Sequence, residues 1–139
     1  MGSVADYLLD TTILSYMLRQ LPKVHEKVAS LIPTDRLVMC SIVRGEVIYG
    51  LERLPHGRKR QDLEAKVTEL FGTLPCEPVP EAAGDHYARI KRETERNGMR
   101  LDENDLWIAA TALSLRAILV TTDSDFQRVS ELNIKDWTL

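Results

Sequence analysis

The chain has 139 residues, of which 44% are hydrophobic and 28% charged, and its formal net charge is −3. A chain of this length typically forms one domain that buries about two-thirds of its unfolded surface, so its core needs no disulfide or metal staple. The slightly negative charge excludes a strongly basic protein that coats nucleic acid. It does not exclude an enzyme that keeps acids in one pocket and basic residues around it.

The sequence has no feature of a membrane or secreted protein. No apolar run reaches the roughly 18 residues of a spanning helix, and Met1–Asp6 lacks the basic and apolar regions of a signal peptide. Met1–Ser3 also fits the scar of an expression tag. Cys40 and Cys76 each lie in a short apolar segment, where we expect buried, reduced thiols, and the histidines lack the spacing of a zinc site. We therefore expect a cytoplasmic protein without membrane contact.

Short apolar segments alternate with helical periods along the first half of the chain. Serine and threonine are expected to cap helices, and Pro22, Pro33 and Pro55 bound them. In chain order we expect a strand at 7–9, a helix from Thr11 or Thr12 to Gln20, a helix at 23–32, a strand at 37–40, a helix from Ser41 to Leu54 and a helix at 61–71.

The second half continues the alternation without a linker or an internal repeat. We expect a strand at 76–79, a charged helix at 81–97 ended by Asn97-Gly98, an apolar helix at 104–116, a strand at 117–121 and an edge strand at 134–137. Continuously apolar strands separated by helices are typical of a parallel sheet covered on both faces. The sequence therefore predicts a single three-layer α/β/α domain over residues 1–139.

Two aspartates follow predicted strands directly. Asp10 follows the first strand, and Asp123 comes after the strand at 117–121 with only Thr122 between. Ligands of open parallel sheets bind beyond the carboxyl ends of the strands, so both side chains are expected at one edge. Like charges at close range disfavour joint ionisation, and a bound divalent cation removes that cost.

Two further acids lie on helices that are otherwise apolar. Glu46 is at the edge of the buried arc of the helix that begins at Ser41, from where a carboxylate can face a cleft. Asp105 opens a helix that is apolar on nearly every side, where an unpaired charge would be expensive. We therefore treat Asp10, Glu46, Asp105 and Asp123 as one candidate cluster.

Each of these acids also has a purely structural interpretation. Asp10 fits a turn or cap residue, Glu46 a surface acid paired with Arg53, and Asp105 a partner of the helix dipole. Asp123 fits an Asx-turn or an N-cap, and Asp125 can fill either role. The basic clusters at 58–60 and 89–100 fit solvated helix faces. The functional interpretation rests on all four acids converging.

The same residues, in the same order, resemble the PIN-domain ribonucleases, particularly the VapC toxins of toxin–antitoxin pairs. The matching pieces, which together extend over essentially the whole chain, are Leu8–Thr12, Ser41 with Glu46, Asn104–Ala110 and Val120–Phe126. The resemblance implies a PIN-like fold and an endoribonuclease that cleaves RNA with magnesium or manganese.

The resemblance also implies roles for individual residues and partners. It implies that Asp10, Glu46, Asp105 and Asp123 are catalytic and hold the metal, with Asp123 the least settled. Supporting residues would be Thr12 and Thr121 by their hydroxyls, and Asp125. The substrate would be an RNA, such as tRNA or another structured RNA. The partners would be a small VapB-like antitoxin and a second copy in a homodimer. Candidate antitoxin contacts are Tyr16, Leu21 and Tyr49.

Three rival functions fit the same fold class. A phosphoacceptor receiver domain would need a lysine after a late strand, where this chain has Thr121, Thr122 and Asp123. A haloacid-dehalogenase-like phosphatase would need a second aspartate two residues after Asp10, where Thr12 stands. An inactive interaction domain of the same fold stays open, because fold alone does not fix function. No P-loop or Gly-x-Gly-x-x-Gly motif is present.

Overall fold

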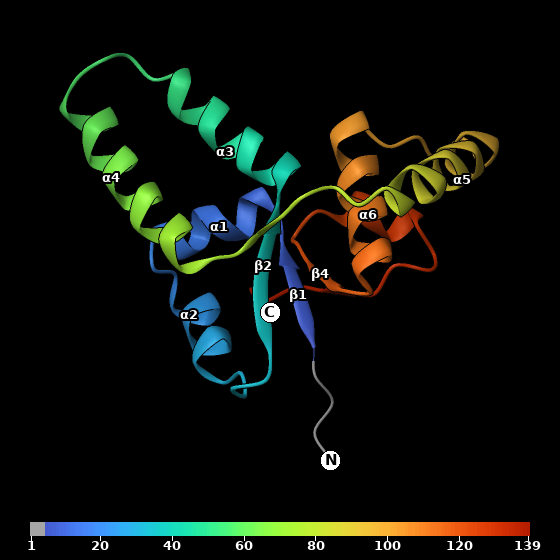
Figure 1. Cartoon of the computed structure of the whole chain (residues 1–139), viewed down its shortest axis with the longest axis horizontal. Coiled ribbons are helices and arrows are strands. Elements are labelled where there is room, and N and C mark those ends of the chain that lie inside the picture. The colour runs from blue at the N-terminus through green and yellow to red at the C-terminus, as the bar shows by residue number, and fades with distance from the viewer. Residues whose placement is uncertain (1–4) are drawn as a thin grey trace.

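The computed structural model describes residues 5–139, so the possible expression scar at Met1–Ser3 lies outside the described residues. Over this range the chain forms one parallel sheet in the order β3-β2-β1-β4-β5, with helices between the strands (Figure 1). The strands are β1 (Asp6–Leu9), β2 (Arg36–Cys40), β3 (Cys76–Glu77), β4 (Ile118–Val120) and β5 (Ile134–Lys135). The helices are α1 (Thr11–Leu18), α2 (Pro22–Ala29), α3 (Ser41–Glu52), α4 (Arg58–Thr73), α5 (Ala82–Arg96), α6 (Glu103–Leu115) and the 3₁₀ helix η1 (Ser124–Arg128).

The helices cover the sheet in two groups. Figure 1 shows α1, α2, α3 and α4 on one side of the strands and α5 and α6 on the other. Within each group the helices contact one another, and α3 also contacts α6. The predicted three-layer α/β/α domain is therefore confirmed, with β5 at the sheet edge as expected.

The central strands and α6 form the core of the domain. Leu8 and Leu9 of β1 are fully buried, as are Leu119 and Val120 of the adjacent β4. On α6 the buried residues are mostly small, which lets the helix pack closely against its neighbours; they are Leu106, Ile108, Ala109, Ala110, Thr111 and Ala112. Within residues 5–139 no helix combines the length and the apolar character needed to span a membrane.

Several predicted boundaries were wrong because the residue that ends or caps the helix differs from the expected one. Asp10, not Thr11 or Thr12, is the N-cap of α1, and Cys40, not Ser41, is the N-cap of α3. Helix α2 ends at Ala29, before Pro33, where the hydroxyl of Ser30 donates to the carbonyl of Lys27.

The predicted segments around α4 and β3 also differ from the structure. Helix α4 begins at Arg58, three residues earlier than predicted, and extends to Thr73. It follows Gly57, whose φ of 151° turns the chain back from α3. Strand β3 contains only Cys76 and Glu77. Cys40 is buried as expected, but Cys76 is exposed because β3 is a short strand at the sheet edge.

The strand order determines where the polar edge of the sheet lies. Parallel strands β1 and β4 are neighbours, with Leu9 opposite Val120, and the amide of Asp10 donates to the carbonyl of Val120 at 3.1 Å. The residues that follow the two strands therefore emerge side by side at the carboxyl end of the sheet.

Candidate active site

Asp10 is the most buried acid of the candidate cluster, with 6% of its surface exposed. Its Oδ1 accepts from the amide of Ile13 at 3.1 Å, which caps α1, and its Oδ2 accepts from the hydroxyl of Thr121 on the neighbouring strand end. Both carboxylate oxygens are thus held in place, one by the helix and one across the sheet. The cap interpretation and the cluster interpretation of Asp10 are compatible.

Asp123 is connected to the same threonine. Its amide donates to Thr121 Oγ1 at 3.0 Å, and its Oδ1 accepts from the amide of Asp125 at 2.9 Å to cap η1. Asp125 forms an ion pair with Arg128 at 3.0 Å. The two candidates for the fourth acid therefore differ in their surroundings: Asp125 has a cationic partner, and Asp123 does not form an ion pair within residues 5–139.

Glu46 reaches the cluster from α3. Its Oε1 accepts from the hydroxyl of Thr11 at 2.7 Å, and Oε2 lies 3.5 Å from the side-chain nitrogen of Asn104 on α6. The alternative pairing with Arg53 was wrong, because the ion pairs of the described residues do not include Glu46 with Arg53; the Arg53 guanidinium instead lies 5.6 Å from the ring centroid of Tyr49. Glu46 therefore links the ends of α1, α3 and α6.

Asp105 lies in the first turn of α6 and is half-buried. Burial is the main reason that its pKa is raised from 3.8 to about 6, and the charges of Asp123, Asp102, Glu46 and Asp125 raise it further. The helix dipole alone would have lowered the pKa. Asp105 therefore lies within electrostatic range of other acids, and the helix dipole does not account for its environment by itself.

The electrostatics of Asp10 show the same convergence. Burial raises its pKa, the hydrogen bonds from Thr121 and Ile13 oppose that rise, and the charges of Asp123 and Glu46 add to it. In the part of the chain that the structure describes, none of the four candidate acids forms an ion pair. The sheet edge therefore carries concentrated negative charge without a cation of the protein to balance it.

The donor chemistry of this edge suits a hard divalent cation, which prefers oxygen ligands. Among the described residues, however, no three acid, histidine or cysteine side chains are close enough to share a metal ion. The acids are thus gathered within electrostatic range, without forming a closed coordination shell.

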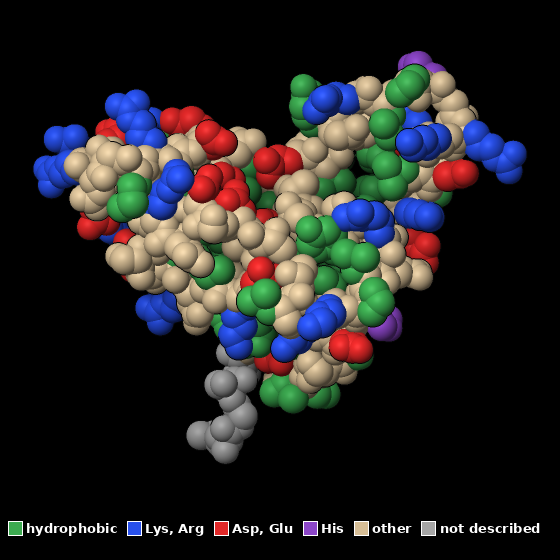
Figure 2. Space-filling model, turned by 180° about the vertical axis from the view of Figure 1, so that it is seen from behind, with side chains coloured by type: hydrophobic (Ala, Val, Ile, Leu, Met, Phe, Trp, Pro, Cys, Tyr) green, Lys and Arg blue, Asp and Glu red, His purple; other side chains and the backbone are tan. Residues whose placement is uncertain are grey.

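The surface around this edge is hollowed. Figure 2 shows a notch between the lobe of α5 and α6 and the lobe of α3 and α4, with acidic side chains beside the notch and basic side chains on both lobes. This distribution fits an acidic centre with basic surroundings, which can attract a phosphate backbone.

Sequence reasoning missed two contacts of the site. Thr12 was expected to support the acids by its hydroxyl, but the hydrogen bond to Glu46 comes from Thr11. Thr121 was also expected to be a hydroxyl support, and its hydroxyl donates to Asp10. Asn104 was noted only as part of a motif, although its position next to Asp105 in a polar first turn was the available signal.

Comparisons with known proteins agree over nearly the whole chain. A family model described as PIN domain matches residues 7–132. Ribonuclease VapC1 of Haemophilus influenzae is 36% identical over 135 residues, which cover 95% of this chain and 98% of the relative. The tRNA(fMet)-specific endonuclease VapC of Shigella flexneri is 28% identical over 137 residues, covering 95% and 98%. The solved structure of VapBC-1 from nontypeable Haemophilus influenzae has a TM-score of 0.84 at 34% identity, covering 96% of this chain and 99% of that chain.

Proposed function

Because the chain belongs to the PIN-domain family, and within it to the VapC ribonucleases, we propose that it cleaves RNA with Asp10, Glu46, Asp105 and Asp123 as its metal-holding acids. By that membership the chain is an endoribonuclease. The observation that carries the assignment of these residues is that four acids, which form no ion pair within residues 5–139, converge at one end of the sheet, where the charges of Glu46 and Asp123 help to raise the pKa values of Asp10 and Asp105.

PIN-domain ribonucleases generally depend on divalent metal ions, and we propose magnesium or manganese as the cation here. When bound, such an ion supplies charge neutralisation at the scissile phosphate and a water that is more easily deprotonated. The oxygen-only donor set and its unbalanced charge support a hard cation over zinc.

The neighbours of the acids would keep them oriented for this task. Thr121 and the amide of Ile13 each occupy one oxygen of Asp10, so its remaining lone pairs have fixed directions. Thr11 holds Glu46 in the same way. Preorganised oxygens lose little rotamer entropy on binding a cation, which favours a shared site over four mobile surface acids.

The direct test is RNA cleavage with and without added magnesium or manganese, in wild type and Asp10→Asn. The variant keeps the shape of the side chain but loses its charge, and we expect activity to fall by at least about 100-fold. Asp62→Asn is the matched control, since it removes the same charge from an exposed position on α4. Equal activity of the wild type and Asp10→Asn would refute the assignment.

For the substrate we propose a structured RNA, and tRNA in particular. The support is the similarity to a relative named as a tRNA(fMet)-specific endonuclease. Exposed basic residues such as Arg58 and Lys59 at the start of α4 could contact the RNA backbone, and the cytoplasm is where that substrate is found. Incubation with total tRNA and with an unstructured RNA of equal length tests this proposal.

We also propose a small VapB-like antitoxin as the protein partner, and a homodimer as the assembled form. The support for the antitoxin is the similarity to a solved VapBC structure. The groove between α1 and α4, lined by Met17, Leu18 and Leu70 with Lys66 and Glu69 at its rim, could take an apolar segment of that partner. Of the expected contacts, Tyr49 is 64% exposed, whereas Tyr16 and Leu21 are half-buried.

A further inference from the structure

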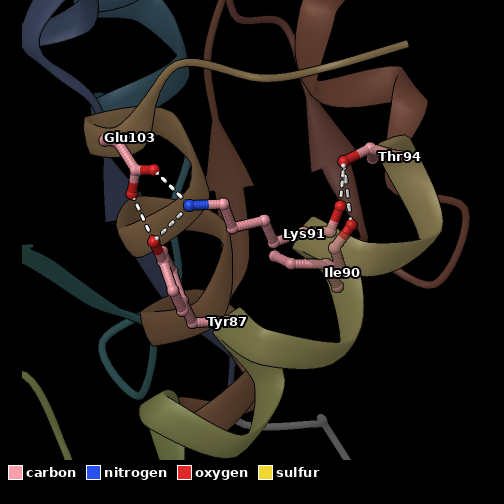
Figure 3. Close-up of polar contacts among 5 residues, drawn as sticks. All are labelled: Tyr87, Ile90, Lys91, Thr94 and Glu103. Carbon is pink, nitrogen blue, oxygen red and sulfur yellow. Dashed lines mark hydrogen bonds and ion pairs between the residues drawn. The ribbon is translucent and has the colours of Figure 1, made fainter. Parts of the chain in front are cut away.

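The first turn of α6 is attached to α5 by a polar cluster outside the group of acids (Figure 3). Glu103, the first residue of α6, accepts from Lys91 Nζ at 2.6 Å through Oε1 and from the hydroxyl of Tyr87 through Oε2. Lys91 also donates to the Tyr87 oxygen at 3.1 Å, which closes a three-membered ring of contacts. Thr94, also drawn in Figure 3, bonds only to carbonyls of its own helix.

Tyr87 holds a second turn of α6 as well. Its ring stacks on the indole of Trp107, with the centroids 4.1 Å apart and an angle of 11° between the planes. Glu103 and Trp107 are four residues apart, so they lie one above the other on the same face of α6. One tyrosine of α5 therefore contacts two successive turns of the helix.

The functional side chains lie on other faces of the same turns. Each residue of an α-helix is rotated by about 100° from the one before, so Asn104 and Asp105 point away from the face that carries Glu103 and Trp107. Asn104 contacts Glu46 at 3.5 Å, and Asp105 lies in the field of Glu46 and Asp123. The rotation of α6 about its axis thus decides whether these side chains face the cluster.

The usual local device for fixing a first turn is missing in α6. Its N-cap, Asp102, forms no side-chain hydrogen bond to the helix amides. The turn that carries Asp105 is therefore held by contacts to α5 and not by its own cap.

We propose that Tyr87 and Lys91 are positioning residues, which fix the rotation of α6 through Glu103 and Trp107 and so direct Asn104 and Asp105 toward the other acids. The inference rests on the proposed role of Asp105 in RNA cleavage. If Tyr87 and Lys91 had a purely structural role, replacing them would affect thermal stability alone. An exposed ion pair such as Lys91–Glu103 is expected to contribute little to thermal stability.

The test compares Lys91→Met with Lys91→Arg, and uses Arg89→Met as the control. Arg89 lies on the same helix and forms an ion pair with Glu131 at 2.7 Å, so its replacement removes an equivalent pair that does not contact α6. All variants are assayed at a temperature where circular dichroism shows them folded. Because displacing a catalytic group by about 1 Å can reduce the rate 100-fold, we expect kcat of Lys91→Met to fall by about 10- to 100-fold while KM for RNA changes little.

The control variants separate positioning from stability. Lys91→Arg keeps a cationic donor and should recover most of the lost kcat, and Arg89→Met should leave kcat unchanged. A wild-type kcat in Lys91→Met, or an equal loss in Lys91→Met and Arg89→Met, would overturn the inference.

Amide hydrogen exchange provides a readout that does not depend on activity. The amide of Leu106 donates to the carbonyl of Asp102 at 2.9 Å and closes the first turn of α6. In Lys91→Met we expect faster exchange at Leu106 and Trp107 and unchanged exchange in β4; unchanged exchange at both residues would overturn the inference. Should the wild type itself cleave no RNA, the proposed function fails, while the exchange experiment still decides whether Lys91 holds this turn.

Discussion

The Thr121 hydroxyl connects the end of β4 to the buried carboxylate of Asp10. Removing it in Thr121→Val keeps the side-chain shape but leaves a buried acceptor without its partner, which typically costs about 1–3 kcal/mol of unfolding free energy. It should also raise the pKa of Asp10 further, because that hydrogen bond is the main influence opposing burial.

Urea unfolding at neutral pH measures the loss. Thr122→Val, at the adjacent half-buried position, is the control and should change the unfolding free energy by only a few tenths of a kcal/mol, on the order of other surface substitutions. If the two variants are equally stable, the Thr121–Asp10 hydrogen bond has no energetic role.

Asp105 makes the metal-free protein sensitive to pH. Its pKa is 3.8 in the unfolded chain and about 6 in the folded protein, so between these values the folded state binds more protons than the unfolded state. The contribution of Asp105 to the free energy of unfolding therefore falls as pH rises from about 4 to about 6, and it stays low above pH 6. Asp105→Asn should remove this dependence and make the metal-free protein more stable at pH 7 than the wild type.

The measurement is the difference in melting temperature between wild type and Asp105→Asn, in the presence of a chelator, across that pH range. Asp62→Asn, exposed on α4, should give no such pH-dependent difference. A melting temperature of Asp105→Asn below that of the wild type at pH 7 would contradict the raised pKa.

At the scale of single residues, the sequence predicts which acids meet but not what holds them. Asp10 and Asp123 follow apolar strands, and parallel topology alone brings such residues to one edge. Whether Thr11 or Thr12 faces Glu46 depends on the residue at which α1 begins. The sequence leaves that start uncertain by one residue, so it could not identify Thr11 as the donor. The Tyr87–Glu103 contact connects two helices whose relative rotation no sequence pattern encodes.

Among the elements, α6 is distinguished by small residues where it packs. Ala109 is fully buried, and α6 contacts α5, α3 and β4. Ala109→Leu would force a larger side chain into filled space, and such overpacking typically costs about 1–3 kcal/mol. Ala65→Leu, on the exposed face of α4, is the control and should be close to neutral. Chemical denaturation of both variants tests this; equal stability would mean that α6 packs more loosely than the structure shows.

Element types were predictable because their hydrophobic periods are long and regular, while their ends were not. The helical period of α5 predicted its range to within one residue at each end. The end of α2 was placed three residues late, since the proline at 33 is a stronger signal in the sequence than the local bond from Ser30 that ends the helix. The brevity of β3 results from its place at the sheet edge, which depends on the whole topology.

For the whole molecule, the unbalanced acids predict a dependence of stability on metal. A cation that binds only the folded state raises its stability by mass action, so millimolar magnesium or manganese should raise the melting temperature of the wild type. The rise should be smaller in Asp10→Asn and Asp105→Asn, and unchanged in Asp62→Asn. The absence of any metal effect on the wild type would count against the site.

The partner protein is also a question for the whole molecule, since α1, α3 and α4 jointly form the face proposed for the antitoxin. Expressed alone, the wild type should arrest growth of its host, whereas Asp10→Asn should not. Co-expression with the small reading frame beside its gene should relieve the arrest, and the two products should co-purify. An arginine of the partner could pair with Asp10 or Asp105 through two charge-assisted hydrogen bonds and take the place of a metal ion.

Two exposed apolar residues allow this face to be tested by substitution. Tyr49 on α3 is 64% exposed and Ile32 after α2 is 46% exposed, so aspartate at either position should leave the fold intact. Tyr49→Asp should weaken co-purification, because it places a charge on α3, where an apolar contact is expected, while Ile32→Asp should not, because Ile32 follows α2 and lies outside the helices α1, α3 and α4 that form the proposed face. If both variants retain the partner equally, the antitoxin binds another face. If the wild type is harmless and nothing co-purifies with it, the toxin–antitoxin role is wrong, and the endoribonuclease would serve its cell without a partner.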